Sequence, residues 1–250
     1  MTPTKKYIYQ HFRSIVTLMD EDKENIVRDF HVKPDAIRVI PYASTGHHGV
    51  YDGLYKQLSE EQTHSSEKPL ILLGNSPREM RNYIKMLDRL SHLRGKIRVQ
   101  CMNNYSLKHS ELYDQLISKG KSIFDDDFKS NEDFHSDRVD YIRYMNSCDV
   151  YVCSSESQTG LGAITTCLQL GKKIYIHGKN LSWIRNHYHA LVFDSDEITD
   201  TISLESLLSP LSIKEKKHNR DSIVMLRSVN AGLWENYLRE IDNANVTTKR

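Results

Sequence analysis

The chain has 250 residues, 38% of them hydrophobic, and a formal net charge of +1. This length supplies one domain or two modest ones with a sizeable core. The near-neutral charge excludes broad nucleic-acid binding, which needs a strong basic excess. No apolar stretch approaches the roughly 18 residues of a membrane-spanning helix, and residues 1–15 lack the apolar core of a signal peptide. We therefore expect a cytoplasmic protein, with peripheral contact at the inner face of the cytoplasmic membrane left open.

The cysteines and histidines give no metal-binding pattern. The four cysteines have no C-x-x-C spacing, lie in or beside apolar runs, and are expected to be small core residues in a reducing compartment. They are Cys101, Cys148, Cys153 and Cys167. Neither His47-His48 nor the trio His177, His187 and His189 has a carboxylate or cysteine at a recognised ligand spacing. We expect no metal and no cofactor.

The first elements form one strand–helix–strand unit. The run 15–19 is short, apolar and partly β-branched, which predicts a buried strand. Asp20 can cap a helix over 21–30, and a second strand follows at 37–40. Residues 56–68 are polar without periodicity and predict a linker.

From residue 70 onward, strands alternate with helices. The predicted strands are 70–73, 97–101, 122–124, 149–153, 173–176 and 191–193, and the predicted helices are 77–92, 107–119, 139–146, 161–170 and 181–187. Gly120 is taken to end the second helix, and the acidic stretch 125–137 to be a loop. The alternation predicts an α/β fold: a Rossmann-like parallel sheet with helices on both faces. A final helix over 221–241 has an apolar face that must dock on something.

Two glycine-containing loops follow apolar strands and open helices. The first is Gly74-Asn75-Ser76, and the second runs from Ser154 to Gly162. A strand that turns into a helix N-terminus offers free N–H groups and the positive end of the helix dipole to an anion. Ligands of parallel sheets bind at the carboxyl ends of the strands. The two loops together predict a site for a diphosphate, as in a nucleotide or nucleotide-sugar.

The candidate residues of this site each have a plainer alternative. In the first loop the alternative is an ordinary turn with Asn and Ser as caps, and in the second it is a tightly packed helix start. A carboxylate at 156 could bond a sugar or ribose hydroxyl or simply be solvated, and an aromatic ring at 105 could stack on a pyrimidine. The full set is Gly74, Asn75, Ser76, Arg78, Tyr105, Glu156, Gln158, Thr159, Gly160 and Gly162. Asn180 and Trp183 either border a donor sugar or are buried.

The region from Val139 to Lys172 resembles the donor loop of GT-B glycosyltransferases. Retaining members carry two glutamates eight residues apart, and the positions aligned on Gly171-Lys172 hold Gln158 and Thr166 here. The chain is more similar to one inverting family, the TDP-Fuc4NAc:lipid II Fuc4NAc transferases, also called the 4-alpha-L-fucosyltransferase family. The shared features are Ile71 to Ser76, Cys148-Asp149, Gln158 to Gly162, Gly171, Asn180, Trp183 and Leu191 to Phe193.

This resemblance implies metal-independent transfer, with inversion, of a deoxyamino sugar like Fuc4NAc from a dTDP-sugar to a lipid-linked acceptor in cell-surface polysaccharide synthesis. It implies four regions: a remnant of the acceptor domain (1–55), a linker (56–68), a nucleotide-sugar-binding domain (69–220), and a C-terminal helix and tail (221–250). The resemblance also implies that this chain lacks most of the family's N-terminal domain. No residue is assigned as catalytic base, and His47 and His48 are only candidates.

Two other hypotheses stay open. The chain could be a non-catalytic nucleotide-binding remnant, or one subunit of a split glycosyltransferase whose C-terminal helix binds a partner or a second copy. A retaining enzyme with degenerate glutamates is disfavoured by Gln158 and Thr166. Basic runs at Lys85–Lys96 and Lys214–Arg220 could face anionic lipid, although a solvated helix face is the simpler interpretation.

Overall fold

A computed structural model describes residues 3–41, 49–61, 68–74, 79–103, 110–131 and 135–247, with side chains up to residue 243. The chain divides into two units, one of residues 1–46 and 225–250 and the other of residues 47–224. Within the described residues, no helix is both long and apolar enough to span a membrane.

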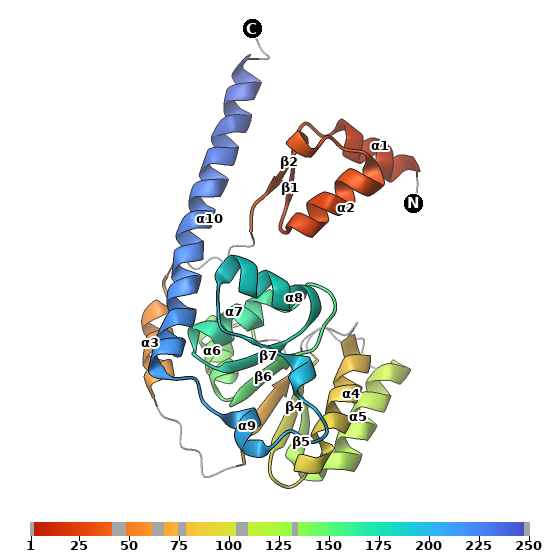
Figure 1. The fold of residues 1–250 in the computed structure, drawn as a ribbon, viewed down its shortest axis with the longest axis vertical. Coiled ribbons are helices and arrows are strands. Elements are labelled where there is room, and N and C mark those ends of the chain that lie inside the picture. Colours follow the sequence, from red (N-terminus) through yellow and green to blue (C-terminus); the bar gives the residue numbers. More distant parts are fainter. Residues whose placement is uncertain are drawn as a thin grey trace. The chain divides into compact units, whose positions relative to one another are not determined.

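The larger unit is built on a six-stranded parallel sheet (Figure 1). Its strands are β3 (Leu70–Leu73), β4 (Arg98–Met102), β5 (Phe128–Asn131), β6 (Val150–Cys153), β7 (Lys173–Ile176) and β8 (Phe193–Asp194), in the order β5-β4-β3-β6-β7-β8. Every residue of β3, β6 and β7 is buried, as expected for central strands covered on both faces. The predicted α/β fold with a parallel sheet is confirmed.

Helices cover both faces of this sheet. They are α3 (Asp52–Glu60), α4 (Met80–Leu90), α5 (Glu111–Phe124), α6 (Arg138–Asn146), α7 (Leu161–Gln169), α8 (Gly178–Trp183, continuing as one π turn over Ile184–Tyr188) and α9 (Leu204–Leu208). Figure 1 shows α4 and α5 together on one side, while α3, α6 and α7 contact one another. Buried side chains of α4, at Met80, Tyr83, Leu87 and Leu90, recur at helical spacing and pack into the main core.

The smaller unit contains a two-stranded parallel sheet. Its elements are α1 (Pro3–His11), β1 (Ile15–Thr17), α2 (Asp20–Phe30) and β2 (Ile37–Val39), and Ile15 pairs with Ile37. The predicted strand–helix–strand unit is therefore present. The long helix α10 (Ile213–Thr247) begins in the larger unit and ends in the smaller one, and it extends beyond the predicted 221–241.

The segment 120–131 was predicted wrongly. Gly120 does not end its helix, because α5 continues to Phe124 and absorbs the expected strand 122–124. A Cβ at Gly120 would lie 2.3 Å from the Phe128 ring, so the glycine allows a close contact inside the helix. Phe128 in turn anchors β5, an edge strand within the stretch expected to be a loop. Polar residues after Phe128 hide this strand from a hydrophobicity pattern.

Other boundaries also differ. Residues 52–60 form α3, where a linker was expected from 56, because Tyr55 is buried against neighbouring helices. Residues 62–67 of that linker lie outside the described residues. The last strand is shorter than predicted and lies at 193–194, while α1 and α9 were not predicted.

Candidate functional site

The site lies where the strand order of the sheet reverses. Renumbered along the chain, the order of the six strands is 3-2-1-4-5-6, and the reversal falls between β3 and β6. In open sheets of this kind, ligands bind outside the carboxyl ends of the strands at the reversal. Leu73 pairs with Val152, so the loops that follow the two strands start side by side. This is the arrangement that the two predicted glycine loops require.

Gly74 connects β3 to its loop and is fixed by its surroundings. Its φ is +73°, and a Cβ there would lie 2.1 Å from Cζ of Tyr83. Its N–H donates to Val152 O at 2.7 Å, and its carbonyl accepts from the Tyr151 hydroxyl at 3.0 Å. The glycine therefore serves the turn, and its own N–H is already used within the protein.

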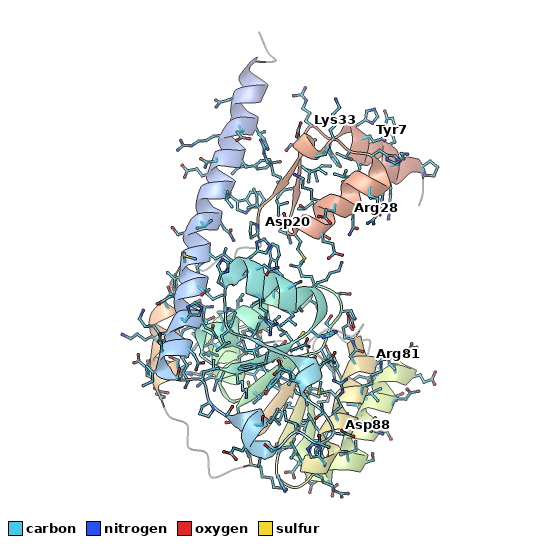
Figure 2. The ribbon with its side chains drawn as sticks, viewed as in Figure 1. Tyr7, Asp20, Arg28, Lys33, Arg81 and Asp88 are labelled. Carbon is cyan, nitrogen blue, oxygen red and sulfur yellow. The ribbon has the colours of Figure 1, made fainter. Side chains whose placement is uncertain are left out.

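Four candidate residues lie outside the described residues, namely Asn75, Ser76, Arg78 and Tyr105. The same holds for His47 and His48, the candidate bases. Arg81, in the first turn of α4, is exposed (Figure 2). The predicted binding of a phosphate by Asn75, Ser76 and Arg78, and of a nucleotide base by Tyr105, stays a prediction.

The loop after β6 is held at its start by α4. Ser155 is fully buried, and its hydroxyl donates to Glu79 Oε1 at 2.9 Å. The Asn82 amide donates to Glu79 Oε2 and to Ser154 O, both at 2.8 Å. These bonds fix the backbone at the start of the loop, since a shift of this segment would break them.

The same loop is held at its end by α8. Asn180 is fully buried; its Nδ2 donates to Thr159 O at 2.8 Å, and its Oδ1 accepts from Thr159 N at 3.3 Å. Trp183 is also buried, and burial was one of the two possibilities given for it, the other being a place beside the donor sugar. Gly178 lets α8 come close, because a Cβ there would lie 2.7 Å from Cα of Glu156. Asn180 thus positions the loop.

The N-terminus of α7 is open. Gly160, with φ +69°, is its N-cap, and no side chain of the described residues caps the helix. Leu161 and Ala163 are buried, whereas Gly162 is half-buried, and a Cβ there would meet no atom of the described residues within 4 Å. Packing against the described residues therefore does not require a glycine at 162, in contrast to Gly74. The first-turn N–H groups of a helix without a side-chain cap, together with its dipole, are suited to bind an anion.

Gln158 lies just before this helix. Its Nε2 is buried and has no hydrogen-bond partner among the described residues. Thr166, at the other aligned glutamate position, is fully buried. Its hydroxyl donates to Gly162 O at 2.7 Å and accepts from Arg138 at 3.2 Å. Neither position supplies a carboxylate to the site.

A second cluster, which the sequence analysis missed, surrounds His177. Its Nδ1 lies 2.9 Å from Asp194 Oδ1 and 3.7 Å from Asp196 Oδ2, and its Nε2 lies 3.3 Å from Glu156 Oε1. The hydrogen bond with Asp194 raises the pKa of His177 above its ordinary value, and the neighbouring carboxylates add to this effect. We call His177, Asp194 and Asp196 the His–Asp cluster. The parallel pairing of Ile176 with Asp194 brings these residues together, although 17 positions separate His177 from Asp194.

A small cavity of about 130 Å³ adjoins the His–Asp cluster. It lies between α4 and the ends of β6, β7 and β8. Its polar lining comprises Asn82, Lys85, Arg89, Ser154, Glu156, His177, Ser195 and Asp196. The predicted residue Glu156 therefore faces the His–Asp cluster, while its side chain remains largely exposed.

The remaining residues of the resemblance have structural roles. Asp149 accepts from Leu70 N at 2.7 Å and so ties β6 to β3. Gly171, with φ +67°, follows α7 and donates its N–H to Leu168 O at 3.1 Å. All four cysteines are free and buried, as predicted. Burial raises the pKa of the Cys101 and Cys153 thiols to about 12, so neither is a reactive thiolate.

Comparison with known proteins identifies the fold. No protein-family model matches the chain, and no curated protein matches its sequence. Among solved structures, a glycosyltransferase from Rickettsia africae ESF-5 matches 95% of the chain with a TM-score of 0.67 at 14% identity. An alpha,alpha-trehalose 6-phosphate synthase from Burkholderia multivorans matches 99% with a TM-score of 0.64 at 8% identity. TarM matches 96% with a TM-score of 0.62 at 10% identity.

These likenesses establish an α/β fold of the GT-B glycosyltransferase type. The chain spans 68% of the Rickettsia protein, 63% of the Burkholderia synthase and 46% of TarM. At such low identities the shared property is the fold.

Proposed function

We propose that this chain binds the donor substrate of a glycosyltransferase, with the diphosphate of a nucleotide-sugar lying over the N-terminus of α7. One observation carries this proposal: within the described part of the chain, α7 begins without a side-chain cap, at the strand-order reversal, and no neighbour there requires the glycine at 162. Residues 69–220 would form the donor-binding domain.

The N-terminus of α7 would help the nucleoside diphosphate to leave the sugar during transfer. Transfer breaks the bond between the anomeric carbon and the diphosphate, and negative charge develops on the leaving group. Fixed N–H groups and a helix dipole stabilise such charge without reorganising. The trehalose-phosphate synthase from Burkholderia vietnamiensis is UDP-forming, and a TarM structure contains UDP. The GT-B fold of both proteins supports a nucleotide diphosphate as ligand.

The finer assignment rests on the resemblance in the sequence. We propose a dTDP-linked deoxyamino sugar like Fuc4NAc as donor, a lipid-linked saccharide as acceptor, and inversion at the anomeric carbon without a metal. One trehalose-6-phosphate synthase of similar fold transfers with retention. Inversion is proposed here because Gln158 and Thr166 replace the glutamates of retaining enzymes, and Thr166 is buried. The configuration of the product, read by NMR, tests this choice.

Calorimetric titration tests the donor site. The protein is titrated with dTDP, UDP and thymidine, so that the base and the diphosphate are varied separately. We expect micromolar binding of dTDP, weaker binding of UDP, and loss of binding with thymidine, which lacks the diphosphate. If thymidine bound as tightly as dTDP, the helix end would not be the site. If no nucleotide bound at millimolar concentration, the donor site would be wrong.

A second candidate function is a nucleotide-binding module that works with a partner carrying the acceptor site. The surface of α10 favours it. Apolar side chains at Met225, Val229, Leu233 and Leu238 are between 39% and 55% exposed. Exposed apolar rows of this kind commonly bind another surface. Size-exclusion chromatography with light scattering tests this, and a clean monomer would count against association through α10.

A further inference from the structure

We propose that the His–Asp cluster binds one Zn²⁺ ion through His177 Nδ1, Asp194 Oδ1 and Asp196 Oδ2, with water as the fourth ligand. The three atoms lie within 4.8 Å of one another, in the part of the chain that the structure describes. Imidazole nitrogen and carboxylate oxygen are both established Zn²⁺ ligands. The proposal does not depend on the proposed function, because the test uses the metal alone.

The distances suit a four-coordinate ion. With metal–ligand bonds of about 2.0–2.1 Å, two ligands of a tetrahedral ion lie about 3.3 Å apart. Here His177 Nδ1 is 2.9 Å from Asp194 Oδ1 and 3.7 Å from Asp196 Oδ2. Shifts of about half an ångström would bring each of the two carboxylate oxygens to this distance from Nδ1. Side-chain rotation supplies such shifts, since Asp196 is mostly exposed.

The groups behind the ligands are those of a metal site. A ligating histidine usually donates its other ring N–H to a carboxylate, and His177 Nε2 lies 3.3 Å from Glu156 Oε1. Arg89 donates to Asp196 Oδ1 at 3.1 Å, which leaves Oδ2 for the ion. Asp194 Oδ1 accepts from Asp196 N at 3.0 Å, which orients that carboxylate.

An independent observation comes from Ser195. This residue is 1% exposed, and its hydroxyl has no hydrogen-bond partner among the described residues. It lines the same cavity as His177 and Asp196. A buried hydroxyl without a partner is costly. The hydroxyl oxygen is itself closed off from the cavity, so a metal-bound water would supply that partner only after the side chain rotates toward the cavity.

The proposed ion would stiffen the carboxyl edge of the sheet. Its ligands come from the loop after β7, the last residue of β8 and the turn that follows β8, whereas Glu156 belongs to the loop after β6 and Arg89 belongs to α4. One ion would thus connect four segments. We assign it no part in stabilising the leaving diphosphate.

Metal binding to the full chain tests this proposal. Zn²⁺ is titrated against a competing chelator dye, and Co²⁺ is added to metal-free protein to read its visible absorption. We expect one site per chain, the intense bands of four-coordinate Co²⁺, and a rise in melting temperature with Zn²⁺. Mg²⁺ is expected not to compete, since it prefers oxygen ligands in octahedral geometry.

Matched variants separate this site from the other histidines and carboxylates. His177→Ala and Asp196→Asn remove ligands, while His135→Ala and Asp200→Asn are controls. His135 follows β5, at the opposite edge of the sheet, and Asp200 is exposed. Glu156→Gln is expected to weaken Zn²⁺ about 10- to 100-fold, and the ligand variants more than that. Because Asp196 is exposed, Asp196→Asn is not expected to impair folding.

The control variants decide the outcome. They are expected to bind Zn²⁺ like the wild-type protein. Equal affinity in the wild type, His177→Ala and Asp196→Asn would place the ion on other residues and overturn the proposal. Failure of the wild-type protein to bind one equivalent would also overturn it.

Discussion

Replacing Gly162 by alanine separates the two explanations for the glycine at the start of α7. If the glycine served helix packing, the added methyl group would collide with a neighbour. None of the residues that the structure describes comes within 4 Å of that methyl group, so the fold should accept it. If the glycine instead lets a ligand approach the helix end, the same methyl group would stand in the ligand's place.

Gly162→Ala is expected to raise the stability of the protein and to lower its affinity for dTDP. Alanine lowers the conformational entropy of the unfolded chain, which raises the free energy of unfolding by about 0.4–1 kcal/mol where the backbone tolerates it. Hydrogen bonds to a charged group contribute about 1.5–3 kcal/mol, and loss of one from the diphosphate corresponds to a roughly 10- to 150-fold rise in the dTDP dissociation constant. Gly162→Ala should therefore be more stable and bind dTDP more weakly.

The assays are thermal unfolding without ligand and calorimetric titration with dTDP. Gly232→Ala is the matched control, because Gly232 lies inside α10 and its added methyl group also meets nothing within 4 Å. The control should gain similar stability and keep its dTDP affinity. Unchanged dTDP affinity in Gly162→Ala would refute the placement of the diphosphate over α7. A loss of stability would refute the open space described at Gly162.

Three further predictions concern other parts of the molecule. Asn180→Ala is expected to lower the free energy of unfolding by about 1–3 kcal/mol, because it removes the hydrogen bonds that hold the loop before α7. It is also expected to weaken dTDP binding, and unchanged binding would contradict the positioning role of Asn180. Gly120→Ala is expected to lower the free energy of unfolding by about 1–3 kcal/mol, because the added methyl group clashes with Phe128. Urea unfolding measures this, with Gly53→Ala as a control that meets no described neighbour, and equal stabilities of the two variants would contradict the contact. If α10 binds a second copy, Leu233→Lys should lower the mass measured by light scattering, and a mass that is unchanged would exclude that face.

The buried strands and their parallel arrangement were predictable from sequence because central parallel strands leave a strong pattern. Runs such as Leu70–Leu73 and Val150–Cys153 are buried on both faces and read as continuous apolar segments. The edge strand β5 was missed because only Phe128 is fully buried in it. The end of the helix was predicted wrongly at Gly120, because the sequence does not distinguish a glycine that ends a helix from one that allows close contact with a neighbouring ring.

The candidate site was predictable in part. The sequence located the loop before α7, but it did not distinguish Gly74, whose place is filled by the Tyr83 ring, from Gly162, which faces open space. Only packing separates these two roles. The His–Asp cluster was missed because ligand spacing was sought along the chain. Pairing of β7 with β8 brings His177 and Asp194 together across the sheet, and strand register decides which residues meet.

The loop from Ser154 to Gly160 is the element on which both proposed sites depend. Glu79 and Asn82 fix its start from α4, and Asn180 fixes its end from α8. Glu156, between these anchors, is a candidate donor residue that also contacts His177. An ion that orders His177 would therefore order this loop as well. By linkage, any gain in dTDP affinity caused by Zn²⁺ must equal the gain in Zn²⁺ affinity caused by dTDP. The two sites share this loop and differ in charge: the anion site uses backbone N–H groups, whereas the cation site uses side-chain carboxylates and imidazole.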